Sequence, residues 1–334
     1  MNNRVTRPPL HWLGNEFAGA LAMVSVVAVA MLDAGWLEAR QQIPATGVDN
    51  VLIVTFDGFR WQELFGGYDA TLNTKTDGGV RRPEDLAARF DRPTPEARRE
   101  ALQPFFWTVV AREGQVLGDA SRGSRVRVTN GLWFSYPGYN EMLSGAADPR
   151  VDSNDKKANP NVTVLEWLNQ HPGFAGRVAA YGSWDVLPFI VAAERSKLHV
   201  NGDGPALLEP ATDRERLLNS IASDVPRVWA SERLDTITTH GALEYLRTRK
   251  PRVLYVMLGE TDAWAHDRRY DQYLDAAWRS DRFVRRLWEE AQALSEYRAR
   301  GRSSGRATTG AARRRATGPT TARRSRPPSR SGWP

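Results

Sequence analysis

The sequence predicts an α/β protein, a three-layer sandwich in which a mostly parallel sheet is covered by helices on both faces. Two short apolar runs, VLIVTF at 51–56 and RVLYVML at 252–258, are typical of strands buried on both faces, because their apolar side chains are continuous and a glycine lies just beyond each run. Along the chain, strand-like segments alternate with helix-like ones, as in parallel sheets whose strands are connected by helices.

The other elements follow from local composition and spacing. Residues 66–95 are rich in Gly, Asp, Arg and Pro and predict a loop with a short helix, and residues 95–114 predict a helix that Pro104 kinks. In 270–297, apolar residues recur at the spacing of one buried helix face. The remaining predictions are strands at 115–119, 125–130 and 177–184, and helices at 161–170, at 185–195 and over most of 212–248.

Composition narrows the classes of function. The chain has 334 residues, enough for one large α/β domain or two ordinary ones, and its hydrophobic fraction of 41% is normal for a globular core. It contains no cysteine, which excludes disulfides, iron–sulfur clusters and thiolate zinc sites. Any metal must therefore be held by carboxylate, imidazole, hydroxyl or water ligands.

The positive charge of the chain is concentrated at one end. The formal net charge is +7, but residues 298–334 contain eleven arginines and no acidic residue, so subtracting 11 from +7 leaves −4 for the rest of the chain. This segment lacks Leu, Ile, Val and Phe, and we expect it to be a disordered tail because it cannot bury a core face. We favour an out-of-frame reading of a GC-rich gene, and the alternative is a basic arm that binds nucleic acid or anionic lipid. For the folded body, residues 50–297, we expect no nucleic-acid partner.

The N-terminal residues predict export. Arg4 and Arg7 precede an apolar stretch at 17–32, which is the arrangement of an export signal. The stretch is shorter than the roughly 20 residues that a membrane-spanning helix needs. Residues 1–49 are therefore expected to hold a cleaved signal peptide or a short membrane anchor, followed by a linker, and the alternative is a buried core helix. We expect a periplasmic, extracellular or membrane-anchored location.

Acidic residues follow both of the predicted buried strands. Asp57 comes directly after the first, and Asp262 and His266 come shortly after the second. In open α/β sheets, ligands collect beyond the carboxyl ends of the strands. The spacing of four between Asp262 and His266 places both side chains on one face of a helix, where they can bind one cation. The alternatives are a turn at Asp57 and an ordinary Asp–His hydrogen bond, but the two strands together favour a metal site.

Ser135 precedes a segment that predicts a helix. Pro137 suits the first turn of that helix, which places Ser135 at its N-terminal end, where free N–H groups and the helix dipole favour an anion. A serine hydroxyl is a weak nucleophile unless a base or a metal activates it. No Ser-His-Asp arrangement is evident, which favours activation by a metal, and the alternative is that Ser135 only caps the helix.

Three motifs in this order, VTFDGFRW, FSYPGYNEMLSG and GETDAWAH, resemble the alkaline phosphatase superfamily over residues 50–297. The resemblance is closest to its type I phosphodiesterase/nucleotide pyrophosphatase-like and sulfatase-like members. It implies a site for two divalent metal ions, most commonly Zn²⁺. Asp57 would ligate one metal, Asp262 and His266 the other, and Ser135 would be the nucleophile.

The resemblance also implies an asparagine that holds the phosphoryl oxygens. Asn154, Asn159 and Asn161 are candidates, and we assign Asn159. The superfamily completes its metal site with a later Asp-His pair and a further histidine, and no histidine follows His266 here. We therefore expect a sheet that is incomplete at the C-terminus and an activity that is impaired in this chain.

These observations favour an exported, metal-dependent hydrolase of phosphate, phosphodiester or sulfate esters, with a small-molecule substrate. A phosphosugar mutase-like enzyme of the same superfamily is one alternative. A non-catalytic, membrane-anchored protein with a basic tail that binds nucleic acid or lipid is the other.

Overall fold

A four-stranded, all-parallel sheet forms the centre of the structure, a computed structural model that describes residues 49–202 and 207–298. The strand order is β1-β4-β2-β3, and β4 lies between β1 and β2. Every residue of β2 and of β4 is buried, which explains the continuous apolar run of β4. The strands are β1 (Val51–Phe56), β2 (Val178–Gly182), β3 (His199–Gly202) and β4 (Val253–Leu258).

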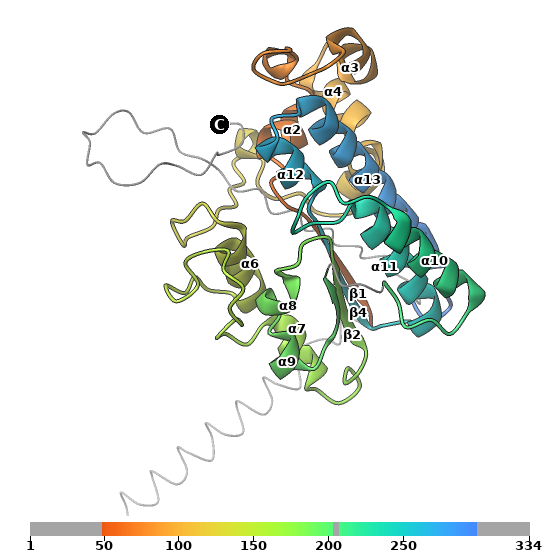
Figure 1. Ribbon diagram of the computed structural model, residues 1–334. Helices are drawn as coiled ribbons and strands as arrows, with labels where there is room; N and C mark the ends of the chain where they lie inside the picture. The colour runs from red at the N-terminus through yellow and green to blue at the C-terminus, as the bar shows by residue number, and fades with distance from the viewer. Residues whose placement is uncertain (1–48, 203–206, 299–334) are drawn as a thin grey trace, which may run out of the picture. The chain divides into compact units, whose positions relative to one another are not determined.

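Helices cover both faces of this sheet and make the three layers that the sequence predicts (Figure 1). One face carries α6 (Ser135–Ser144), α7 (Val164–Asn169), α8 (Leu187–Ile190) and α9 (Ala193–Ser196). The other carries α10 (Asp213–Asp224), α11 (Asp235–Arg249) and α13 (Tyr270–Ala293). The remaining α-helices are α2 (Trp61–Gly66), α3 (Pro83–Phe90), α4 (Pro95–Leu102), α5 (Ala111–Glu113) and α12 (Glu260–His266).

The alternation of side chains along β4 divides the core into two layers. Tyr255 and Met257 pack with apolar residues of α6, α7 and α8, whereas Leu254 and Val256 pack with those of α11 and α13. All four side chains are at most 1% exposed. Burial of each such side chain contributes roughly 1.5–3 kcal/mol, so β4 anchors both helical layers to the sheet.

A third apolar cluster lies under α2, α3 and α4 and packs against the first half of α13. The helix predicted at 95–114 is interrupted there after Leu102, as Pro104 indicates, and a π-helical turn follows at Phe106–Val110. Asp281 of α13 satisfies the interrupted backbone, because its carboxylate accepts hydrogen bonds of 2.8 Å from the N–H groups of Phe105 and Phe106. These two hydrogen bonds therefore hold the interrupted part of the helix against α13.

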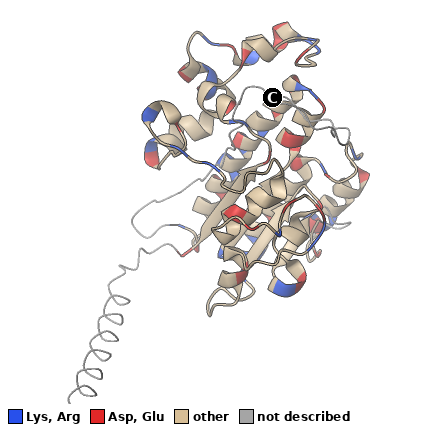
Figure 2. Cartoon of the chain, turned by 90° about the vertical axis from the view of Figure 1, so that its left-hand side faces the viewer, with Lys and Arg blue, Asp and Glu red and all other residues tan. Residues whose placement is uncertain are grey.

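Basic and acidic side chains are interspersed over the side of the chain drawn in Figure 2. Among the ion pairs between helices, Arg214 of α10 pairs with Glu244 of α11, and Arg247 of α11 pairs with Glu290 of α13.

Most of the predicted elements are confirmed, with some differences. The strands predicted at 115–119 and 125–130 are wrong: both segments are irregular, and Leu117, Val126 and Val128 are exposed with no strand beside them. The single helix predicted at 185–195 is two short helices, α8 and α9, because the backbone at Ala192 takes a left-handed conformation. The sequence reading also missed β3 and α2.

Two of the predicted regions lie outside the described residues. They are the N-terminal stretch at 17–32 and the arginine-rich tail, apart from Arg298. Within the ranges that the structure describes, no helix is both long and apolar enough to cross a membrane.

Candidate functional site

The carboxyl ends of β1 and β4 bring the predicted acidic residues together. Phe56 and Leu258, the last residues of the two strands, are paired in the parallel register. The pairing continues one residue further, because the N–H of Asp57 donates to the Leu258 carbonyl over 2.9 Å. Asp57 therefore lies beside Gly259, from which α12 begins and carries Asp262 and His266.

Gly58 allows α12 to approach Asp57 closely. Its φ is +64°, a left-handed conformation that favours glycine, and a Cβ atom at this position would lie 2.6 Å from Cα and 2.7 Å from Oδ1 of Asp262. The hydroxyl of Thr261 also donates to the main-chain carbonyl of Asp57. These two contacts fix the first turn of α12 against the end of β1.

Ser135 is the first residue of α6, as predicted, and its side chain faces Asp57. The Ser135 Oγ donates to Asp57 Oδ1 over 2.9 Å. The Asn154 Oδ1 accepts a hydrogen bond of 3.0 Å from the next backbone N–H of α6, that of Tyr136. The N-terminal end of α6 is thus directed toward the carboxyl end of β1.

Asp262 and His266 lie on one face of α12, as their spacing predicts. The His266 Nε2 is 3.3 Å from the Asp262 Oδ2. The imidazole is 55% exposed and the Asp262 side chain 27% exposed, so both can be reached from solvent. The structure therefore brings Asp57, Ser135 and Asp262 to one edge of the sheet, with His266 beside Asp262.

The Asp57 carboxyl is enclosed by protein, although part of the residue remains accessible. This burial raises the pKa of Asp57 to about 7, and the negative charge of Asp262 contributes to the increase. The hydrogen bond from Ser135 acts in the opposite direction and lowers the pKa, as does an interaction with Tyr139. Asp57 is thus a carboxyl group that can exchange a proton near neutral pH.

Glu232 belongs to the same group of carboxylates, and the sequence reading missed it. Burial raises its pKa to about 9, and the charges of Asp57 and Asp262 add to the effect. The Glu232 Oε2 is buried without a hydrogen-bond partner among the described residues. It lies so close to Gly259 that a Cβ there would be 2.5 Å from it. No motif around Glu232 could have revealed this placement.

The three candidate asparagines lie in different surroundings. Asn159 is completely buried, with its side chain bonded to the Ile190 carbonyl and to the N–H of Asn161. These contacts do not include Ser135. Asn154, by contrast, bonds the residue that follows Ser135 in α6.

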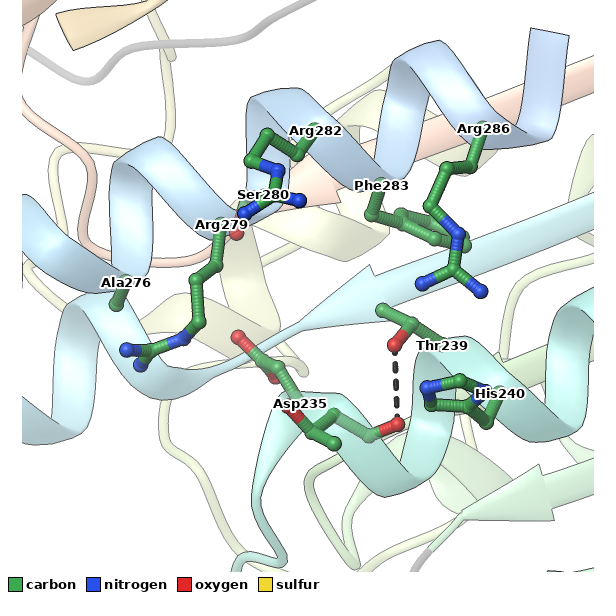
Figure 3. A pocket seen from close by; sticks show the side chains of 10 residues that line it. Asp235, Thr239, His240, Ala276, Arg279, Ser280, Arg282, Phe283 and Arg286 are labelled. Atoms are coloured by element: carbon green, nitrogen blue, oxygen red, sulfur yellow. Dashed lines mark hydrogen bonds between the residues drawn. The ribbon is translucent and has the colours of Figure 1, made fainter. Parts of the chain in front are cut away.

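A separate pocket lies between α11 and α13 (Figure 3). Its volume is about 170 Å³, and none of the predicted site residues lines it. The lining includes Asp235 and His240 of α11 and Arg279, Arg282 and Arg286 of α13. The pocket therefore lies in the helical layer that covers the face of the sheet opposite to α6.

Within residues 49–202 and 207–298, no three or more His, Asp or Glu side chains form a group that could hold a metal ion. Asp57, Asp262 and His266 therefore do not form such a group by themselves among the described residues. Comparison with known proteins adds no relative: neither a protein-family model nor a curated protein matches the chain.

Proposed function

We propose that the chain is a metal-dependent hydrolase of phosphate, phosphodiester or sulfate esters in which Ser135 is the nucleophile. The hydrogen bond from Ser135 Oγ to Asp57 Oδ1 carries the proposal, because it places a hydroxyl on a carboxylate at the carboxyl end of the sheet. The order of the three motifs, with their resemblance to the alkaline phosphatase superfamily, supports the same reaction class.

The residues present fit a divalent cation. The donor set of carboxylate, imidazole and hydroxyl groups suits such an ion. Asp57 and Asp262 are held close together, and the negative charge of Asp262 raises the pKa of Asp57. A bound cation would offset this repulsion between the two carboxylates. The unpartnered Glu232 Oε2 adds a second buried acidic oxygen to the same region. Asp57 would hold one metal ion, and Asp262 and His266 would hold the other.

When bound, a divalent cation supplies positive charge that favours the ionised hydroxyl and offsets the charge on the ester oxygens. The chain's own residues orient the nucleophile. Asp57 Oδ1 directs the Ser135 Oγ through its hydrogen bond, and the Ser135 proton passes to water as the hydroxyl attacks. The bond from Oγ to phosphorus or sulfur forms while the bond to the leaving oxygen breaks, and water then cleaves the serine ester. The N-terminal end of α6 favours the negative charge on the transferred group.

The test uses the full chain with Zn²⁺ and three chromogenic substrates, p-nitrophenyl phosphate, bis(p-nitrophenyl) phosphate and p-nitrophenyl sulfate. We expect Zn²⁺ binding by calorimetry and hydrolysis of at least one ester, and the ratio of the three rates identifies the substrate class. Ser135→Ala should reduce that rate to the background.

Ser144→Ala is the matched control, because Ser144 lies at the other end of α6 and bonds the Asn140 carbonyl. It should leave the rate unchanged. Absence of Zn²⁺ binding, or equal rates for Ser135→Ala and the unaltered chain, contradicts the proposal.

A further inference from the structure

Two buried acidic residues, Asp235 and Glu260, cap each other's helices. Asp235 is the first residue of α11 and Glu260 the first residue of α12. The Asp235 carboxylate accepts hydrogen bonds from the N–H of Gly259 over 2.9 Å and from the N–H of Glu260 over 3.1 Å. In return, the Glu260 Oε1 accepts one of 2.8 Å from the N–H of Asp235.

The helix N-termini themselves explain why these contacts are needed. The first N–H groups of a helix have no partner within the helix, and they require an acceptor when they are buried. Neither α11 nor α12 has a capping side chain at its own N-cap residue. Asp235 therefore supplies the acceptors for two N–H groups at the start of α12, and Glu260 supplies the acceptor for the first N–H group of α11.

Further bonds hold this pair in place. The hydroxyl of Ser183, just after β2, donates to the Asp235 carboxylate. Arg279 of α13 pairs with the Glu260 Oε2 and offsets one of the two negative charges. In Figure 3, the side chains of Asp235 and Arg279 extend from facing helices into the same space. Asp235 thus joins the ends of β2 and β4 to the two helices.

The residues held by this network include the proposed cation ligands. Asp262 is in the first turn of α12, and His266 follows one turn later. The other side of that turn is held by the bond from Thr261 to the Asp57 carbonyl. Asp235 does not contact Asp57 or Ser135 through any hydrogen bond of the described residues, so its influence on the site passes through α12.

We propose that Asp235 is a positioning residue that orients α12, and with it Asp262 and His266, for cation binding. The inference rests on the proposed function, since it assigns those two residues to a cation. Asp235→Asn is the informative substitution. It preserves the size of the side chain but replaces one acceptor oxygen by an NH₂ donor, which cannot bond the N–H groups of α12.

The experiment compares the full chain with Asp235→Asn and with Thr212→Ala. Thr212 forms a capping box with Glu215 at the start of α10. Thr212→Ala therefore also removes an N-terminal helix cap, but from α10 and not from α12. Zn²⁺ affinity is measured by calorimetry, and amide hydrogen exchange of residues 259–262 is measured without metal.

In Asp235→Asn we expect Zn²⁺ affinity to fall about 10- to 100-fold, which is the usual effect of losing a residue that orients a metal ligand. Exchange at 259–262 should accelerate in that variant only. Thr212→Ala should lower the melting temperature while Zn²⁺ affinity stays the same. Equal affinities for Asp235→Asn and the unaltered chain overturn the positioning role alone. An unaltered chain that binds no Zn²⁺ overturns the proposed function and the positioning role together.

Discussion

Ser135 donates a hydrogen bond from its Oγ to Asp57 Oδ1 over 2.9 Å, and 78 positions of sequence separate the two residues. The bond joins the first residue of α6 to the residue that follows β1. It therefore depends on both the strand and the helix being in place, and it brings a hydroxyl to a carboxylate whose pKa is about 7.

Gly58→Ala should lower both the free energy of unfolding and the Zn²⁺ affinity. The new Cβ would lie 2.6 Å from the Cα of Asp262, so α12 must move away from Asp57. Gly123→Ala is the control, because Gly123 has a φ of +75° but no atom within 4 Å of the added Cβ. In urea denaturation, we expect the free energy of unfolding of Gly123→Ala to fall by about 1–2 kcal/mol from backbone strain alone. That of Gly58→Ala should fall further. Equal losses would show that the close approach does not matter.

Thr261→Val should weaken cation binding with a modest loss of stability. The substitution keeps the shape of the side chain but removes the bond to the Asp57 carbonyl, which contributes about 0.5–1.5 kcal/mol. Thr248→Val removes a similar bond, to the Glu244 carbonyl within α11, and serves as the control. Calorimetry with Zn²⁺ should distinguish the two variants, and the prediction fails if both bind the ion equally tightly.

Glu232→Gln should reduce the dependence of stability on pH. The folded-state pKa of Glu232 is about 9 and its ordinary value is 4.5, so the native state holds a proton that the unfolded state releases between these values. The stabilisation from that proton is complete below pH 4.5 and is lost as pH rises toward 9, at up to about 1.4 kcal/mol per pH unit. Urea denaturation from pH 5 to 8 with a metal chelator measures the slope. Identical slopes in variant and unaltered chain contradict the prediction.

Asp281→Ala should destabilise the interrupted helix at 95–114. The Asp281 carboxylate is the acceptor for two backbone N–H groups, and their loss should cost about 1–3 kcal/mol each when they are left buried. Asp281→Asn retains one acceptor oxygen and should lose less. Thermal denaturation should rank the unaltered chain above Asp281→Asn, and Asp281→Asn above Asp281→Ala, in melting temperature. An asparagine variant less stable than the alanine variant would contradict the capping role.

The regular elements that could be predicted are those with a strong local pattern. The apolar run of β4 and the long amphipathic face of α13 are sufficient to identify a buried strand and a helix. Val126 and Val128 alternate with arginines as in a strand, yet they pair with no strand of the described sheet and remain exposed. The opposite error occurs in β3, where His199 and Asn201 have no strand-like pattern but pair with β2.

The site could be predicted only where a residue adjoins a recognisable element. Asp57 and Asp262 follow strands, and Ser135 precedes a helix, so their positions along the chain indicate a common edge. Glu232 lies between α10 and α11, and Asp235 is the first residue of α11, in a segment without a motif. They reach the site because Ser183, Gly259 and the sheet bring that segment to the carboxyl ends of β2 and β4, which is a tertiary relationship that local sequence does not contain.

The most direct test of the account is to locate the group that the chain transfers. The full chain with Zn²⁺ is mixed with p-nitrophenyl phosphate, quenched in acid and digested, and the peptides are examined by mass spectrometry. We expect p-nitrophenolate to be released as the phosphoryl group is transferred to the Ser135 hydroxyl, and we expect no phosphorylated peptide from Ser135→Ala. A phosphorylated peptide that lacks Ser135, or p-nitrophenolate release that persists undiminished in Ser135→Ala, would contradict it.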